Sequence, residues 1–260
     1  MHLMPNNISK PHRGDAPKLV VMDLLGVFVE HDEAVRSALA AAFQAHGERV
    51  DPDVAGMAIG HPGLQGIYRV FQWLYPMERP NDSAVKSIHE LAVKELQRLV
   101  RFGGAIQPSS SVVRLCEMWT RAGLQVAATT TLDARVVKVL LHRLGWDETP
   151  PFHALVLAEE VERPTPGPDM ILQCMARLGV ENLQEVAKVA THVRGLSDAR
   201  QLGCGWNVLI DDGNLTMDQI AVLAPTAILD QASDLARLWS LPVHSDVELE
   251  DEIARFLARP

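Results

Sequence analysis

The sequence contains few cysteines and few basic residues, and each shortage excludes a class of protein. The 260 residues include 3 cysteines, an odd number at wide spacing. This argues against a disulfide framework or a cysteine-based zinc site and predicts reduced thiols in a cytoplasmic protein. Acidic residues outnumber basic ones by 33 to 24, which gives a formal net charge of −9. We therefore expect neither a nucleic acid nor an anionic membrane surface as a partner.

Long apolar runs are also absent. No stretch approaches the roughly 18 consecutive apolar residues of a membrane-spanning helix. Residues 1–17 contain no apolar segment either, so we predict a flexible leader there rather than a signal peptide. With 47% apolar and 22% charged residues, the composition is that of a globular chain with one large domain, or a main domain with an insert.

From Lys18 onward, short apolar runs alternate with helical patterns. The helical segments repeat apolar residues at a spacing of three to four, which places one apolar stripe against a sheet. Strands alternating with helices predict right-handed βαβ units and a doubly wound parallel sheet, that is, an α/β fold. The runs typical of buried parallel strands are residues 19–22, 124–128, 154–157, 186–190, 206–210 and 226–229.

A segment of helical character interrupts this alternation directly after the first strand. Residues 32–106 contain two long helical patterns and no convincing strand. We predict an α-helical cap over residues 32–106, inserted into an α/β core made of residues 18–31 and 107–260.

Ligands of open α/β sheets bind beyond the carboxyl ends of the strands, so the residues that follow each apolar run are the candidates for a site. Asp23 follows the first run and the threonines 129–131 follow the second. The third run leads to Arg163, and the fourth leads to His192 and Arg194.

An aspartate after the first strand, a helical insert and a hydroxyl residue after the second strand resemble the haloacid dehalogenase superfamily, and in particular its phosphonatase-like branch. The resemblance extends from Lys18 to about Leu238. It implies a nucleophilic role for Asp23 and a phosphoryl- or substrate-orienting hydroxyl at Thr129 or Thr130. The further motifs that carry it are residues 132–146, 166–171 and 203–208.

Several positions depart from the family pattern. Thr165 occupies the place of the family's Lys or Arg, and Leu25 that of a second acid. Thr191 and Gly195 replace the two acids that hold magnesium, and we expect Asp198, one turn later, to face elsewhere. A site with few carboxylates binds magnesium poorly. Because this sequence lacks the acids of the family pattern, we expect no cofactor. Gly63 stands where true phosphonoacetaldehyde hydrolases carry a Schiff-base lysine, which argues against that activity.

Basic and imidazole side chains near the strand ends favour an anionic small molecule as the ligand. The candidate substrate-binding residues are Thr130, Arg163, His192, Arg194 and, in the cap, His61. Each also has a plain structural alternative: Asp23 and the threonines suit helix caps or strand ends, and the histidines and arginines suit polar surface.

Three functions remain open. The first is a repurposed, metal-independent enzyme in which Asp23 is nucleophile or general base and Thr129 orients the substrate. Metal-free aspartate chemistry has a precedent in the dehalogenase branch of the superfamily, where the carboxylate attacks carbon. The second is a non-catalytic relative that binds a ligand, and the third is a conventional magnesium-dependent phosphohydrolase.

The cap sequence also predicts a homodimer. Phosphonatase-like proteins tend to pair, and Tyr68, Phe71, Trp73 and Tyr75 offer apolar area for a symmetric contact. Light scattering at high micromolar concentration is expected to give twice the chain mass of 28.6 kDa. A monomeric mass under these conditions would contradict the prediction.

Overall fold

The structure is a computed structural model that describes residues 16–30, 33–104, 106–211 and 215–239. Apart from residues 16 and 17, the leader predicted at residues 1–17 lies outside the described residues. So do residues 31 and 32, at the predicted start of the cap, and the end of the chain from residue 240. No helix of the described ranges is long and apolar enough to cross a membrane.

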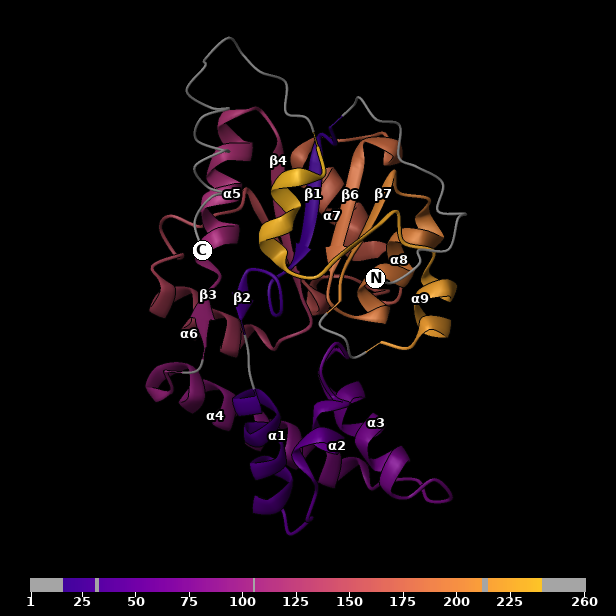
Figure 1. The fold of residues 1–260 in the computed structure, drawn as a ribbon. Helices are drawn as coiled ribbons and strands as arrows, with labels where there is room; N and C mark the ends of the chain where they lie inside the picture. Colours follow the sequence, from indigo (N-terminus) through magenta and orange to yellow (C-terminus); the bar gives the residue numbers. More distant parts are fainter. Residues whose placement is uncertain (1–15, 31–32, 105, 212–214, 240–260) are drawn as a thin grey trace.

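A six-stranded parallel sheet forms the centre of the core (Figure 1), as the apolar runs predict. The strand order is β5-β4-β1-β6-β7-β8, with β1 between β4 and β6. The fully buried backbone of β1 thus delivers its last residue, Asp23, to the middle of the sheet's carboxyl edge. The strands are β1 (Leu19–Asp23), β4 (Gln125–Thr130), β5 (Ala154–Leu157), β6 (Val186–Ala190), β7 (Trp206–Ile210) and β8 (Ala227–Leu229).

Helices cover both faces of this sheet. On one face, α5 and the short 3-10 helix Ala232–Arg237 pack together, and on the other α7 and α8 contact β1, β4, β5, β6 and β7. Side chains of alternate residues in β1 enter the two different hydrophobic clusters, because successive side chains of a strand point to opposite faces. The core helices are α5 (Ser110–Arg121), α6 (Ala134–Leu144), α7 (Asp169–Leu178), α8 (Val193–Leu202) and α9 (Met217–Leu223).

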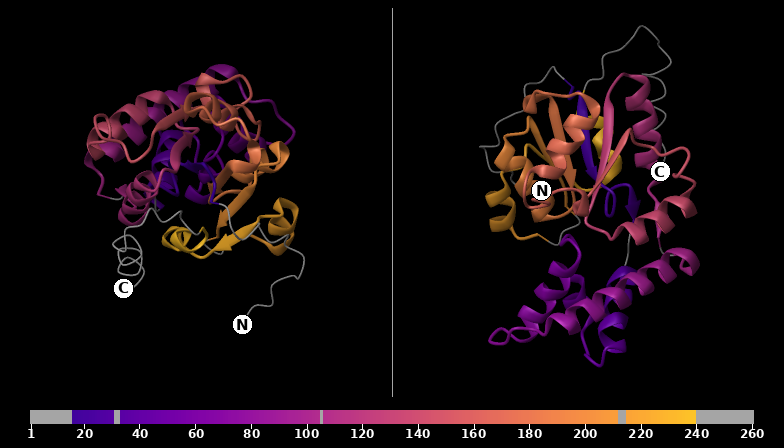
Figure 2. Two further views of the ribbon diagram at one scale, coloured as in Figure 1. Left: turned by 90° about the horizontal axis from the view of Figure 1, so that it is seen from above. Right: turned by 180° about the vertical axis from the view of Figure 1, so that it is seen from behind.

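The insert after β1 is helical, as expected, and lies beyond the carboxyl ends of the strands (Figures 1 and 2). Two short antiparallel strands, β2 (Val29–Glu30) and β3 (Gln107–Pro108), pair where the chain leaves the core and returns to it. Their pairing brings the two connections together at one point. The cap helices are α1 (Glu33–Ala45), α2 (Pro52–Gly56), α3 (Leu64–Leu74) and α4 (Asp82–Phe102).

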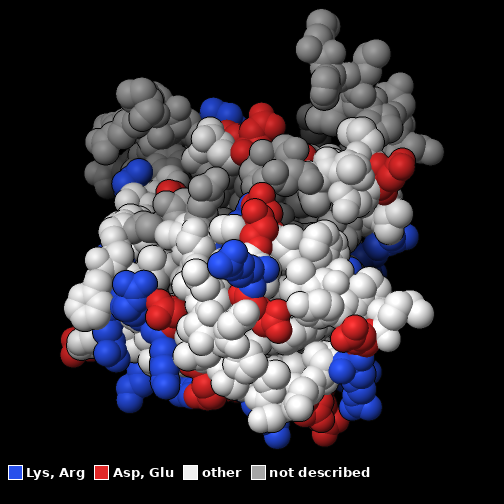
Figure 3. All heavy atoms as spheres, turned by 90° about the horizontal axis from the view of Figure 1, so that it is seen from below, with Lys and Arg blue, Asp and Glu red and all other residues white. Residues whose placement is uncertain are grey.

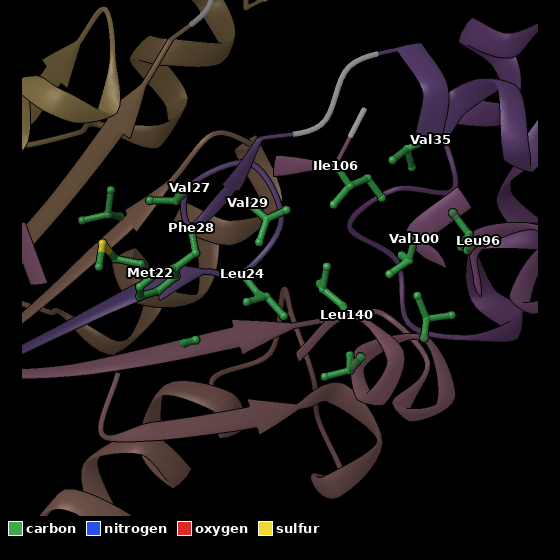
Figure 4. Packing of buried hydrophobic residues seen from close by; sticks show 14 of the residues in the cluster. Met22, Leu24, Val27, Phe28, Val29, Val35, Leu96, Val100, Ile106 and Leu140 are labelled. Atoms are coloured by element: carbon green, nitrogen blue, oxygen red, sulfur yellow. The ribbon is translucent and has the colours of Figure 1, made fainter. Parts of the chain in front are cut away.

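One hydrophobic cluster runs from the sheet into the cap (Figure 4). Met22 and Leu24 of the core belong to it together with Leu96 and Val100 of α4. At the rim, Arg135 of α6 forms a bidentate ion pair with Glu90 of α4, with N–O distances of 2.7 and 2.9 Å. The shared hydrophobic cluster and this ion pair hold α4, the last helix of the cap, on the core.

The aromatic residues proposed for a dimer contact are not equally available. Phe71 is buried against Phe43, whereas Trp73 and Tyr75 are exposed. The phenol of Tyr68 donates a hydrogen bond to Asp82 at 2.5 Å. Charges of both signs are interspersed with uncharged residues on the outer face of the cap (Figure 3). A symmetric contact of the cap would therefore have the side chains of Trp73 and Tyr75 to use, but not that of Phe71.

Candidate active site

Three side chains meet at the carboxyl edge of the sheet. The ammonium Nζ of Lys188 lies 2.6 Å from Oδ1 of Asp23 and donates a second hydrogen bond to Oγ1 of Thr129 at 2.9 Å. The Thr129 hydroxyl donates to the same Asp23 oxygen at 3.2 Å. Asp23 and Thr129 are register partners in β1 and β4, which explains why their side chains lie side by side.

Lys188 reaches Asp23 because of its register in β6. It pairs with Val21, which stands two residues before Asp23 and shares its face of the sheet. Two residues of a strand span about 6.6 Å, a distance that an extended lysine side chain covers. Lys188 was missed in the sequence because it stands inside an apolar run that predicts a strand. The signal in the sequence was a lysine within an apolar run. Such a run predicts a buried strand, and a lysine buried there requires a charged partner.

Lys188 is charged. Its side chain is 2% exposed, and burial alone would favour the neutral amine. The carboxylates of Asp23 and Asp198, together with the hydrogen bond to Asp23, outweigh that burial and raise the pKa of Lys188 above its ordinary value. An ammonium has three N–H donors, and Asp23 and Thr129 accept two of them.

This cluster forms the floor of a cavity between the core and the cap. The cavity encloses about 120 Å³. Apolar side chains of α1, α3 and α4 form the wall opposite the floor. Of the residues proposed from the sequence, those that line the cavity are Asp23, Thr129, Thr130, His61, His192 and Arg194.

The first turn of α8 closes one side of the cavity, next to Asp23. A Cβ atom at Gly195 would stand 2.7 Å from Oδ2 of Asp23 and 2.8 Å from Cβ of Ala190. Only glycine permits this close approach of the helix. The first turn of α8, with its unsatisfied N–H groups and positive dipole end, is thereby brought close to the carboxylate.

Arg194, on the same turn, lines the cavity and is partly buried. Its Nη2 donates to the carbonyl oxygen of Thr165 at 3.2 Å, while its Nε is buried and has no hydrogen-bond partner among the residues that the structure describes. Burial, with a smaller contribution from the charge of Arg69, lowers the pKa of Arg194 from its ordinary value. A buried donor without an acceptor is costly, and an anion would remove this cost.

His61 extends from the loop between α2 and α3 to the same cavity. Burial and the positive charges of Arg194 and Arg69 lower the pKa of His61 to about 4. The imidazole is therefore neutral at pH 7 and contributes a hydrogen-bond donor or acceptor rather than a charge. Thr130, also buried, accepts a hydrogen bond from the N–H of Leu132 at 3.1 Å.

Two expectations about neighbouring charges need correction. Arg163 is not among the residues that line the cavity: its guanidinium pairs with Asp169 at 2.8 Å and is 68% exposed. Asp198 does not face elsewhere: it is 2% exposed and lines the cavity with Asp23 and Lys188. A helical side chain points back toward the preceding turn, which for Asp198 is the turn of Gly195.

Sequence comparison agrees with this geometry. The profile of the haloacid dehalogenase-like hydrolases matches residues 17–190, more than half of the chain. The chain belongs to the haloacid dehalogenase-like hydrolase family. The match ends at the carboxyl end of β6 and so includes Asp23, Thr129 and Lys188. No curated protein matches the chain.

Several solved structures have the same fold at low sequence identity. A hydrolase from Pseudomonas syringae has a TM-score of 0.72 and 16% identity, over 85% of this chain and 96% of its own. A predicted phosphoglycolate phosphatase from Haemophilus somnus 129PT has a TM-score of 0.71 and 17% identity, over 85% and 97%. A phosphonoacetaldehyde hydrolase-like protein from Oleispira antarctica has a TM-score of 0.70 and 17% identity, over 98% of both chains.

The resemblance to magnesium-dependent members of the haloacid dehalogenase-like family raises the question of a metal site here. Magnesium requires oxygen ligands, usually one or two carboxylates with substrate oxygens and water. The corresponding positions hold Leu25, Thr191 and Gly195, and the space next to Oδ2 of Asp23 contains the backbone of α8. Within the described ranges, no group of three or more His, Cys, Asp or Glu side chains is placed to hold a metal ion. The residues present do not fit magnesium.

The electrostatics of the cavity can be tested at His61. Replacing Arg194 with Gln removes a positive charge that, after burial, is the next largest cause of the lowered pKa of about 4. The pKa of His61 should rise by roughly half a unit to one unit, measured from its ring-proton chemical shifts as a function of pH. A wild-type pKa of His61 near 6.5 would contradict the described position of this side chain.

Proposed function

We infer that this protein is a hydrolase that acts on a small anionic molecule without magnesium, with the carboxylate of Asp23 as the nucleophile. The observation that carries this proposal is the cluster of Asp23, Lys188 and Thr129 on the floor of a cavity that the cap covers. Asp23 is held there by two donors, one of which is an ammonium that balances its charge.

Lys188 and Thr129 hold the carboxylate of Asp23 in one orientation, which suits a nucleophile. Both donate to Oδ1 of Asp23, which fixes the plane of the carboxylate and the direction of its other oxygen. Holding the nucleophile and the substrate in a defined geometry lowers the barrier for attack. The third N–H of Lys188 is then available to stabilise negative charge on the substrate or the leaving group.

Arg194 and the N-terminus of α8 favour an anionic substrate. The buried Nε of Arg194 has no acceptor within the structure, and helix N-termini attract anions through their free N–H groups and dipole. His61, neutral at pH 7 because its pKa is lowered to about 4, can hydrogen-bond the same group without adding charge. A carboxylate is a substrate group that would accept hydrogen bonds from these donors.

The size and walls of the cavity restrict the rest of the substrate. A cavity of roughly 150 Å³ holds a benzene molecule, so about 120 Å³ admits a molecule of similar or smaller size. Opposite the polar floor, the lining is aliphatic. A short organic acid with an alkyl segment and a leaving group on carbon fits both features. The residues of this aliphatic wall are Val35, Leu39, Ile67, Ala92, Val93 and Leu96.

The chemistry proposed for Asp23 is direct displacement at carbon. An oxygen of Asp23 attacks the substrate carbon, the bond to the leaving group breaks, and the leaving group departs with the bonding electron pair. The product of this step is an ester of Asp23, which water then hydrolyses. The cap excludes bulk water from the first step, which strengthens the electrostatic interactions of Lys188 and Arg194 with the reacting groups.

The proposal predicts that turnover requires Asp23 and not magnesium. 2-Bromopropionate, as a probe acid, is expected to release bromide equally with a chelator and with magnesium. Asp23→Asn should lower the rate by at least about 10³-fold, since it removes the nucleophile. Asp218→Asn is the matched control, because this residue is exposed on α9 and is not among the residues that line the cavity.

Two results would contradict the proposal. One is full activity of Asp23→Asn. The other is a calorimetric titration in which magnesium binds more tightly than about millimolar and loses that binding in Asp23→Asn. An inactive wild type that still binds propionate at Arg194 would instead indicate a non-catalytic binding protein.

A further inference from the structure

Asp198 is a buried acid that the proposed displacement at Asp23 does not use. It belongs to α8, is 2% exposed and lines the same cavity as Asp23 and Lys188. Its Oδ1 accepts a hydrogen bond from the N–H of Ala199 at 2.7 Å. In the part of the chain that the structure describes, this is the one hydrogen bond that the Asp198 side chain receives from another residue. A buried carboxyl group with so few partners calls for a functional explanation.

Gly195 has no side chain to separate Asp198 from Asp23. The two residues are three apart on α8, so they share one face of the helix, and the Asp198 side chain points back toward the turn of Gly195. Any side chain at Gly195 would stand 2.7 Å from Oδ2 of Asp23. The glycine leaves this position without a side chain between the two carboxyl groups.

Lys188 couples electrostatically to both acids. Its ammonium forms an ion pair with Asp23 at 2.6 Å, and the charges of both Asp23 and Asp198 act on it. Asp198 lies beyond the 4.0 Å limit of a direct ion pair with Lys188, because none of the ion pairs in the described ranges includes it. Asp23, Lys188 and Asp198 thus line one cavity, with the ammonium in electrostatic interaction with both carboxyl groups.

We propose that Asp198 is the general base that activates the water for hydrolysis of the Asp23 ester. This role rests on the proposed function, since it requires that an ester forms on Asp23. It gives the site the second acid that Leu25, Thr191 and Gly195 lack, supplied one helical turn farther along α8.

Hydrolysis of the ester needs a proton acceptor and then a proton donor, and Asp198 serves as both. The water oxygen bonds to Cγ of the Asp23 ester while Asp198 takes one water proton. The tetrahedral intermediate then loses the substrate oxygen, which receives the proton from Asp198 and leaves as the hydroxyl group of the product. The second water proton leaves to solvent as Asp23 returns to the carboxylate form. Overall, the substrate and water give an alcohol, the leaving-group anion and a proton.

Protonation equilibria support this role. Burial, together with the negative charge of Asp23, raises the pKa of Asp198 to about 7, although Lys188 acts in the opposite direction. A base with a pKa near the working pH transfers protons most effectively. A folded-state pKa above the unfolded value also stabilises the protein at low pH, and this stability is lost as the pH rises through about 7.

The decisive experiment follows the Asp23 ester in Asp198→Asn with 2-bromopropionate as the probe. The variant is expected to release one burst of bromide and then to slow by at least about 10²-fold relative to wild type. Intact-protein and peptide mass spectrometry should find the ester accumulated on the peptide that contains Asp23. Asp198→Glu should restore part of the turnover, and Asp218→Asn should behave as wild type.

The outcomes separate the two proposals. Wild-type turnover in Asp198→Asn, with Asp23→Asn inactive, would overturn the role of Asp198 and leave the proposed function intact. So would an Asp198→Asn protein that neither releases bromide nor forms the ester while wild type does both. If wild type itself forms no ester and releases no bromide, the proposed function fails, and the assignment of Asp198 fails with it.

A measurement without substrate checks the acid independently. The melting temperature of wild type relative to Asp198→Asn is expected to fall as the pH rises from 5 to 8, since the folded-state pKa of Asp198 is about 7 and its ordinary value is 3.8. A difference between the two proteins that does not change over this range would contradict a buried, protonatable Asp198.

Discussion

The buried ion pair between Lys188 and Asp23 is the constraint on which the rest of the site depends. A lysine that is 2% exposed in the middle of β6 would destabilise the sheet strongly without a charged partner. Asp23 is that partner, so folding of the core requires the aspartate at the end of β1 to accept the ammonium. The same contact fixes the carboxylate for the proposed chemistry. The structural role of Asp23 and its proposed catalytic role therefore require the same contact, and the first does not exclude the second.

The cap covers the site that the ion pair between Lys188 and Asp23 organises. It is not a loosely attached domain, since one hydrophobic cluster continues from the sheet into α4 and Arg135 pairs with Glu90 at the rim. Its aliphatic residues and His61 cover the polar floor and leave a small cavity. The position of the cap follows from the chain itself, because the insert starts just after the strand that ends in Asp23. The position of the insert directly after β1 thus explains why the cap covers the carboxylate of Asp23.

Much of this arrangement could be predicted from the sequence, because apolar periodicity specifies strands and helices directly. The parallel sheet, the helical insert and the position of Asp23 at a strand end all followed from it. What could not be predicted depends on long-range register. Lys188 is distant from Asp23 in sequence and reaches it only because β6 pairs with β1. Arg163, close to the expected motif position, instead pairs with Asp169, the first residue of α7. The direction of Asp198 depended on how closely α8 approaches Asp23 at Gly195, which no local pattern reveals.

The most direct test of a metal-independent, lysine-balanced site is a crystal structure of the protein grown with magnesium and beryllium fluoride, a phosphate mimic that binds aspartate nucleophiles together with magnesium. We expect that no metal ion binds at Asp23 and that the ammonium of Lys188 remains in contact with its carboxylate. An octahedral magnesium ion coordinated by Asp23, with a fluoride adduct on the carboxylate, would contradict a metal-independent site and place the protein among the conventional magnesium-dependent phosphohydrolases.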